Sequence, residues 1–114
     1  MEQRRCHRLS IELLVSFESM GAVHIAKTND ISATGLCILT RENLKIGKIL
    51  PIRLTLPQGQ KISLQVKIIW INEIPLGSIS EYKVGLQIIS SNRSEEEKFV
   101  QFYAQQLAEF YKDR

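Results

Sequence analysis

IRLTLPQGQKISLQVKI, residues 52–68, alternates apolar and polar side chains on both sides of a Pro-Gln-Gly-Gln turn. A period of two places every second side chain on the same face, which is typical of a half-buried β-strand. A turn between two such runs joins them as neighbours. The stretch therefore predicts a β-hairpin that turns one face of each arm toward a hydrophobic core.

Further β-rich runs lie at residues 13–17, 23–28, 36–40 and 82–88. Ser19, Met20 and Gly21 separate the first two runs, and the glycine is available for a left-handed turn conformation, so a second hairpin is expected. Alternation fails within residues 68–71, at the end of the hairpin described above. This failure predicts either a strand that is covered on both faces or a β-bulge.

The period changes after Asn92. Ser94 and Glu97 have the spacing of a capping box, and three glutamates in the first turn suit the positive end of a helix dipole. Apolar side chains then recur at spacings of three and four, at Phe99, Phe102, Tyr103, Leu107, Phe110 and Tyr111. The pattern predicts an amphipathic helix over residues 94–112 that packs on the strands, and a partial use in a homodimer stays open.

Six strands followed by one helix predict an all-β fold, a six-stranded antiparallel barrel or closed sandwich with the C-terminal helix packed on it. A parallel α/β fold is disfavoured because no helical period lies between the strands. At 114 residues the chain is expected to form a single domain, 1–114. It divides into an arginine arm (1–10), a β-barrel (11–90) and a C-terminal helix (94–112).

The composition is close to that of water-soluble globular proteins, with 44% hydrophobic and 24% charged residues. No segment is long enough to cross a bilayer, and the N-terminus lacks the apolar run of a secretory signal. We therefore expect a cytoplasmic protein without membrane insertion. Cys6 and Cys37 are expected to be reduced, one of them buried as a small apolar residue.

Positive charge is concentrated in the front of the chain. Residues 1–93 contain 12 Lys and Arg against 7 Asp and Glu, a net charge of +5, whereas residues 94–114 contain 3 against 5, a net charge of −2. Arg4, Arg5 and Arg8 form a cluster that suits a phosphate-bearing partner or, equally, a solvated tail.

Arg4 and Arg8 form the string R-x-x-x-R. In an extended segment their side chains share one face. Each guanidinium can bind phosphate oxygens or the O6/N7 edge of guanine with two hydrogen bonds, and can also stack on a base. By itself the string has low specificity, because it arises by chance in many basic termini.

Asp30-x-Ser32-x-x-Gly35 follows between the second and third predicted strands. As a turn, it has Asp and Ser side chains that bond nearby backbone and a glycine with positive φ. As a binding site, Asp30 accepts the paired N–H donors on the Watson–Crick edge of guanine, with the Ser32 hydroxyl beside it. Gly35 then lets backbone and ligand approach closely. Taken by itself, the string favours the turn.

The two strings together, in this order and at this separation, resemble the PilZ family, whose motifs read R-x-x-x-R and D/N-x-S-x-x-G. The similarity continues through a doubled arginine in the arm, a strand directly after it, the strand with Trp70, a Val-Gly-Leu strand at residues 84–86 and a C-terminal helix. Trp70 is left outside the predicted site, because a core or barrel-mouth role fits it at least as well.

The resemblance implies a six-stranded antiparallel barrel that binds cyclic di-GMP. It places phosphates and guanine faces at Arg4 and Arg8, assisted by Arg5, and a guanine-side wall at Asp30, Ser32 and Gly35. It further implies a receptor that changes conformation and signals to a protein partner, in control of motility, adhesion or exopolysaccharide production. The alternative is a PilZ-like adaptor that acts through protein contacts without nucleotide.

Other classes of function find less support. We expect no enzyme, cofactor or metal, because His7 and His24 have no nucleophile at motif spacing, and the four Cys and His residues match no common zinc pattern. Binding to a nucleic-acid polymer needs aromatic side chains interleaved with basic ones. Here five of the eight aromatic residues lie in the C-terminal segment and the clustered arginines at the other end.

Overall fold

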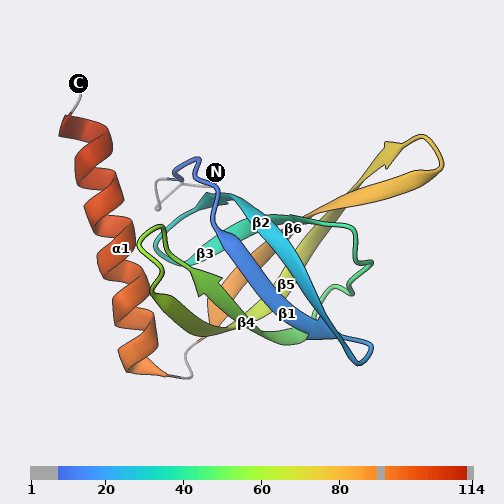
Figure 1. Cartoon of the computed structure of the whole chain (residues 1–114), viewed down its shortest axis with the longest axis horizontal. Helices are drawn as coiled ribbons and strands as arrows, with labels where there is room; N and C mark the ends of the chain where they lie inside the picture. The colour runs from blue at the N-terminus through green and yellow to red at the C-terminus, as the bar shows by residue number, and fades with distance from the viewer. Residues whose placement is uncertain (1–7, 90–91, 113–114) are drawn as a thin grey trace, which may run out of the picture.

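The computed structural model describes residues 8–89 and 92–112. The elements follow in the order β1 (Leu14–Ser19), β2 (Ala22–Ile31), β3 (Gly35–Thr40), β4 (Ile49–Thr55), β5 (Lys61–Leu76), β6 (Ile79–Ile89) and α1 (Arg93–Lys112) (Figure 1). The strands form a closed antiparallel barrel in the order β1-β2-β3-β6-β5-β4, and β4 pairs with β1 to complete the ring. The predicted barrel with one C-terminal helix is confirmed.

Both predicted hairpins are present. In the β4–β5 hairpin, Ile52 lies opposite Leu64 and both side chains are buried in the barrel, whereas the next pair along, Arg53 and Ser63, is exposed. The β1–β2 hairpin turns through Met20 and Gly21, with φ values of 56° and 78°. The left-handed glycine was predicted, and the left-handed methionine beside it was not.

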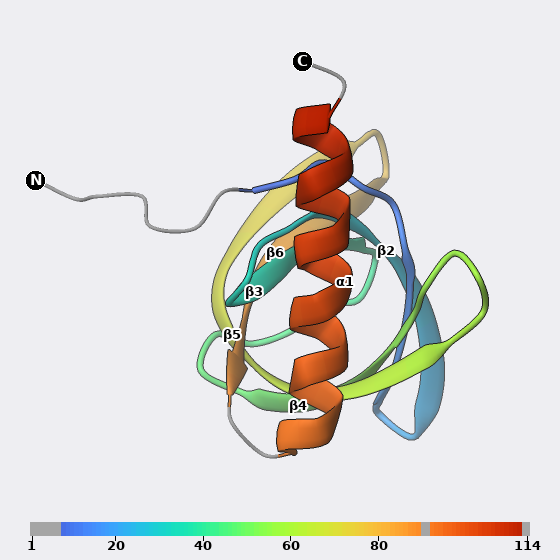
Figure 2. The ribbon, with the colours of Figure 1, turned by 90° about the vertical axis from the view of Figure 1, so that its left-hand side faces the viewer.

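The helix α1 lies across one open end of the barrel (Figure 2). Phe99, Phe102 and Tyr103 are buried and belong to the same hydrophobic core as the inward side chains of the strands. Further along the stripe, Phe110 and Tyr111 are 38% and 55% exposed. The first half of the stripe therefore packs on the barrel as predicted. No helix of the described residues is long and apolar enough to span a membrane.

The helix begins at a different cap from the one predicted. The amide N–H of Glu95 donates to the side-chain oxygen of Asn92, at 3.1 Å, and the Glu96 carboxylate reaches back to the N–H of Asn92 at 3.3 Å. Asn92, rather than Ser94, is therefore the capping residue, and its side chain satisfies one of the free N–H groups of the first turn. The Glu95 carboxylate accepts a 2.8 Å bond from the backbone N–H of Ser63, which ties the helix to β5.

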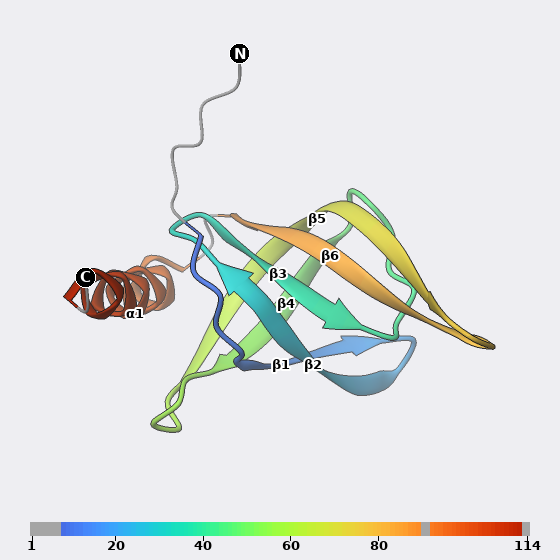
Figure 3. The same ribbon diagram turned by 90° about the horizontal axis from the view of Figure 1, so that it is seen from above.

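Strands β5 and β6 continue beyond the barrel as a two-stranded ribbon (Figures 1 and 3). Their pairing runs on to Leu76 and Ile79, whereas β4 pairs with β5 as far as Lys67 and β3 pairs with β6 as far as Tyr82. The sequence predicted the part of β6 inside the barrel, at residues 82–88, and missed this extension.

Candidate functional site

Two β-bulges lie in one row across the outside of the barrel. The β2–β3 ladder shifts register between Thr28 and Asp30, and the β5–β6 ladder shifts between Ile68 and Trp70. The break in alternation at residues 68–71 is therefore a bulge. Each bulge adds a residue to its strand and redirects the side chains beside it, which is why bulges are frequent at binding sites.

Cross-strand pairs connect the two bulges through β3 and β6. Asp30 lies opposite Cys37, Cys37 opposite Gly85, and Gly85 opposite Trp70. Residues that face each other across antiparallel strands point to the same side. Each of these four residues has a chain neighbour that belongs to the core or packs against it, so its own side faces outward. We call Asp30, Cys37, Gly85 and Trp70 the outer row.

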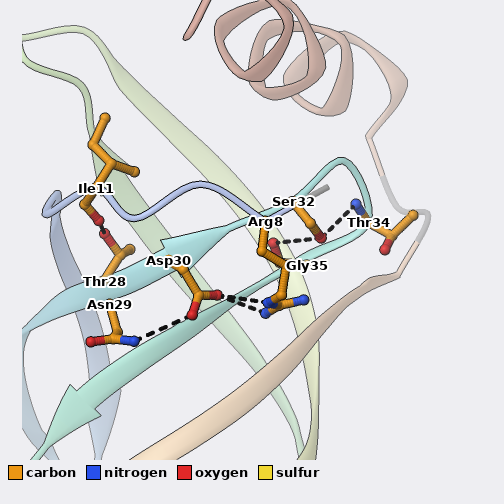
Figure 4. A network of polar contacts seen from close by, with 8 residues as sticks. All are labelled: Arg8, Ile11, Thr28, Asn29, Asp30, Ser32, Thr34 and Gly35. Atoms are coloured by element: carbon orange, nitrogen blue, oxygen red, sulfur yellow. Dashed lines mark hydrogen bonds and ion pairs between the residues drawn. The ribbon is translucent and has the colours of Figure 1, made fainter. Parts of the chain in front are cut away.

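Arg8 and Asp30 meet at the β2 end of the outer row. Nε and Nη2 of Arg8 lie 2.9 and 2.8 Å from Oδ1 of Asp30, while the Asn29 amide donates to Oδ2 at 3.2 Å (Figure 4). Backbone hydrogen bonds of 2.8 and 2.9 Å between Leu9 and Ile31 hold the end of the arm beside β2. The backbone pairing therefore brings a predicted cation and a predicted acceptor together.

Ser32 and Gly35 form the turn between β2 and β3. The N–H of Ser32 donates to the Gly35 carbonyl at 2.8 Å, and its hydroxyl donates to the same carbonyl at 3.4 Å and accepts from the N–H of Thr34 at 3.3 Å (Figure 4). Ser32 is fully buried. Its hydroxyl therefore builds the turn, and a direct contact with a ligand stays a prediction.

Gly35 is needed for a reason that the sequence did not indicate. Its φ is not positive, so the turn expectation for this glycine is wrong. A Cβ at this position would instead clash with the backbone carbonyl oxygen of Leu86 on β6. Gly35 thus permits β3 and β6 to approach closely where the turn begins. Asp30 also departs from expectation, because it lies within β2 at the bulge and not in the turn.

Trp70 closes the other end of the outer row. A Cβ on Gly85 would clash with the Trp70 indole, so the ring lies directly over this glycine. The Trp70 side of the row is therefore a half-buried aromatic surface, and a planar ring can stack on such a surface. Trp70 is not among the site residues predicted from the sequence. The failed alternation around it, opposite a glycine, was the signal that could have included it.

Cys37 lies between the two ends, fully buried although it faces outward. Burial raises the pKa of its thiol above the usual 9.0, and the negative charge of Asp30 raises that pKa further. The positive charges of Lys83 and Arg8 lower it. Charges of both signs, one anion and two cations, therefore act on the centre of the outer row.

The site lies on the outer face of β2, β3, β6 and β5. A hollow of about 850 Å³ lies elsewhere, over the outer faces of β1, β4 and β5, and is lined by Val23, Ile49, Arg53 and their neighbours. It contains no predicted site residue. Arg4 and Arg5 lie outside the described residues, so of the six predicted residues the structure places Arg8, Asp30, Ser32 and Gly35.

Comparison with known proteins gives the fold a family. The sequence model of the PilZ domain family matches residues 2–105. No curated protein sequence matches the chain. Among solved structures, the MrkH–c-di-GMP complex of K. pneumonia superposes with a TM-score of 0.84 at 18% identity, covering 100% of this chain and 57% of that chain.

Two further structures share the fold. The PilZ domain of YcgR from Escherichia coli, with c-di-GMP, has a TM-score of 0.73 at 15% identity and covers 99% of this chain and 100% of that chain. The inhibitor of motility MotI/DgrA from Bacillus subtilis has a TM-score of 0.74 at 18% identity, covering 96% of this chain and 53% of that chain. The chain thus spans about half the length of MotI, and at these identities the likeness concerns the fold.

Proposed function

Because the chain belongs to the PilZ domain family, we propose that it is a receptor for cyclic di-GMP that binds on the outer face of β2, β3, β6 and β5. The observation that carries the proposal is the meeting of Arg8 and Asp30, 22 residues apart in sequence, on that face. MrkH and the PilZ domain of YcgR, which share the fold, were both solved with c-di-GMP.

The chemistry of the outer row suits a guanine nucleotide. The Asp30 carboxylate can accept the two N–H donors on the Watson–Crick edge of guanine. Trp70 offers an aromatic face at the other end of the row, three strand spacings or about 14 Å away. Between them, Cys37 is small and buried, and the Trp70 indole covers Gly85. Ser32 and Gly35 act by fixing the turn beside Asp30.

Binding requires an exchange of partners at Asp30. In the structure, Arg8 occupies Oδ1 of this carboxylate and Asn29 donates to Oδ2. We infer that guanine replaces Arg8 at Asp30 and that the released guanidinium binds a ligand phosphate, together with Arg4 and Arg5 of the arm. The arm, residues 1–10, then changes position when ligand binds. This movement is the conformational signal that a protein partner reads, and motility, adhesion or exopolysaccharide control are the processes proposed.

Isothermal titration of the full chain with cyclic di-GMP tests the proposal. We expect a dissociation constant near micromolar, about −8 kcal/mol. Arg8→Ala and Asp30→Ala should each weaken binding by about fivefold or more, since each removes a charge-assisted contact. Arg53→Ala is the matched control, because Arg53 is an exposed arginine of the barrel that lines the hollow away from the outer row. No heat from the wild-type chain would refute the receptor.

One observation favours the adaptor as a second candidate. The Asp30 carboxylate already has partners at both oxygens, so the Arg8–Asp30 pair is also explained as a contact that fixes the arm on the barrel. An adaptor would bind its protein partner equally well with and without cyclic di-GMP. Absence of titration heat from a correctly folded chain would favour this candidate.

A further inference from the structure

Lys83 lies beside the Trp70 end of the outer row. It precedes Gly85 by two residues on β6, so its side chain points to the same outer face. Gly85 is directly opposite Trp70, and same-face residues in this diagonal relation are about 7–8 Å apart, within reach of a long side chain. The register therefore places a cation next to the aromatic surface, at the opposite end of the row from Arg8.

Lys83 has no charged residue directly opposite it, and Glu81 precedes it by two residues on the same face of β6. The cross-strand partners of Lys83 are Leu39 on β3 and Asn72 on β5, both uncharged. Within residues 8–89 and 92–112, none of the ion pairs includes Lys83. Its side chain is half-buried, so it lies along the barrel surface rather than extending into solvent. Its field reaches the Cys37 thiol, in the middle of the outer row.

At the other end of the row the charges cancel, because Arg8 and Asp30 form an ion pair. The site thus contains one cation that is ion-paired with Asp30 and, beside Trp70, a second cation that belongs to none of the ion pairs of residues 8–89 and 92–112. An uncharged aromatic ligand would gain nothing from Lys83. A ligand with anionic groups at both ends would use both cations, and a cyclic dinucleotide carries two phosphodiesters.

We propose that Lys83 is a further ligand-binding residue, whose ammonium group binds a phosphodiester of the nucleotide at the Trp70 end of the outer row. This inference rests on the proposed function. It adds to the motif residues a contact that comes from the strand opposite Trp70 and that determines affinity for the charged part of the ligand.

Fluorescence of Trp70 provides the test, because it is the single tryptophan of the chain and a stacked guanine should change its emission. The chain is titrated with cyclic di-GMP as wild type, Lys83→Ala, Lys83→Arg and Lys27→Ala. Lys27 is the matched control. It is exposed on the same face and lies in the same cross-strand row as Lys83, with Leu39 between them, about 10 Å away.

Lys83→Ala should bind about tenfold more weakly, the effect of losing one charge-assisted hydrogen bond, and Lys83→Arg should stay within about threefold of wild type. Lys27→Ala should be unchanged. An unaltered affinity in Lys83→Ala, or an equal loss in both alanine variants, would overturn the inference. Circular dichroism and urea unfolding show whether Lys83→Ala is correctly folded, so that a loss of affinity is not caused by misfolding. Binding by Lys83→Arg gives a second check, because it depends on the restored positive charge. If the wild type and Lys83→Ala bind cyclic di-GMP equally well, the proposed role of Lys83 is refuted, whereas the proposed receptor function is not.

Discussion

Alanine at Arg8, at Asp30 and at both positions measures whether their ion pair breaks when cyclic di-GMP binds. Two guanidinium nitrogens lie 2.8 and 2.9 Å from one carboxylate oxygen, and the two side chains are 35% and 18% exposed. A pair this accessible to solvent stabilises the chain by about 0.5–1 kcal/mol. A charge-assisted hydrogen bond from each side chain to ligand contributes about 1.5–3 kcal/mol.

If ligand separates the pair, each single variant loses one ligand contact but no longer has an ion pair to break. Each single change then weakens binding by about 1–2 kcal/mol, or roughly 5- to 30-fold. The double variant loses both ligand contacts. The cost of breaking the ion pair is removed once in the double variant, but it is removed in each of the two single variants and so is counted twice in their sum. The loss in the double variant should therefore exceed the sum of the two single losses by the energy of the pair, about 0.5–1 kcal/mol, or roughly two- to fivefold.

Calorimetric titration of the four proteins measures these losses, with NMR titration for the weakest binder. Additive losses would mean that Arg8 and Asp30 stay paired in the complex. A double loss smaller than the sum would mean that Arg8 positions Asp30 for the ligand. Either result would refute the exchange of partners and the signal derived from it.

Three further predictions concern the fold that supports the site. Gly85→Ala should displace the Trp70 indole and lower the free energy of unfolding by about 1–3 kcal/mol in urea titration, whereas unchanged stability would contradict the contact. Asn92→Ala should lower the free energy of unfolding by about 1 kcal/mol and Ser94→Ala should change it little. The reverse order would support the Ser94 capping box predicted from the sequence. The backbone N–H of β5 and a neighbouring lysine hold the pKa of Glu95 below its ordinary value of 4.5. The stability that wild type has over Glu95→Gln should therefore be present at neutral pH and disappear as pH falls through this lowered pKa, and a pH-independent difference in thermal unfolding would count against the bond.

The strands and the helix were predictable because their signals are local. Alternation over residues 52–68 and the three-four spacing after Asn92 each lie within one element. The start of the helix was not predictable, because Asn92 and Ser94 are both good capping residues and each has a glutamate three residues later. Local sequence cannot choose between them. The choice depends on Glu95, whose side chain is held by β5.

The site was predictable in part. The motif residues came from the sequence, but the position of Asp30 within β2 depends on pairing with Cys37, which extends the strand past its β-prone part. The contact between Trp70 and Gly85 depends on the β5–β6 register, and the link from there to Asp30 depends on β3–β6 pairing across a long sequence separation. Such pairings leave no periodic signal in the sequence. The position of Lys83 beside Trp70 follows from these pairings and could not be predicted without them.

An NMR titration of the isotope-labelled chain with cyclic di-GMP tests the central claim most directly, because it reports both whether and where the ligand binds. The largest shifts are predicted for the backbone amides of Arg8, Asp30, Gly35 and Gly85 and for the indole N–H of Trp70, all on the outer face of β2, β3, β6 and β5 or at its edge. An unchanged spectrum, or shifts confined to the hollow over β1 and β4, would contradict the account.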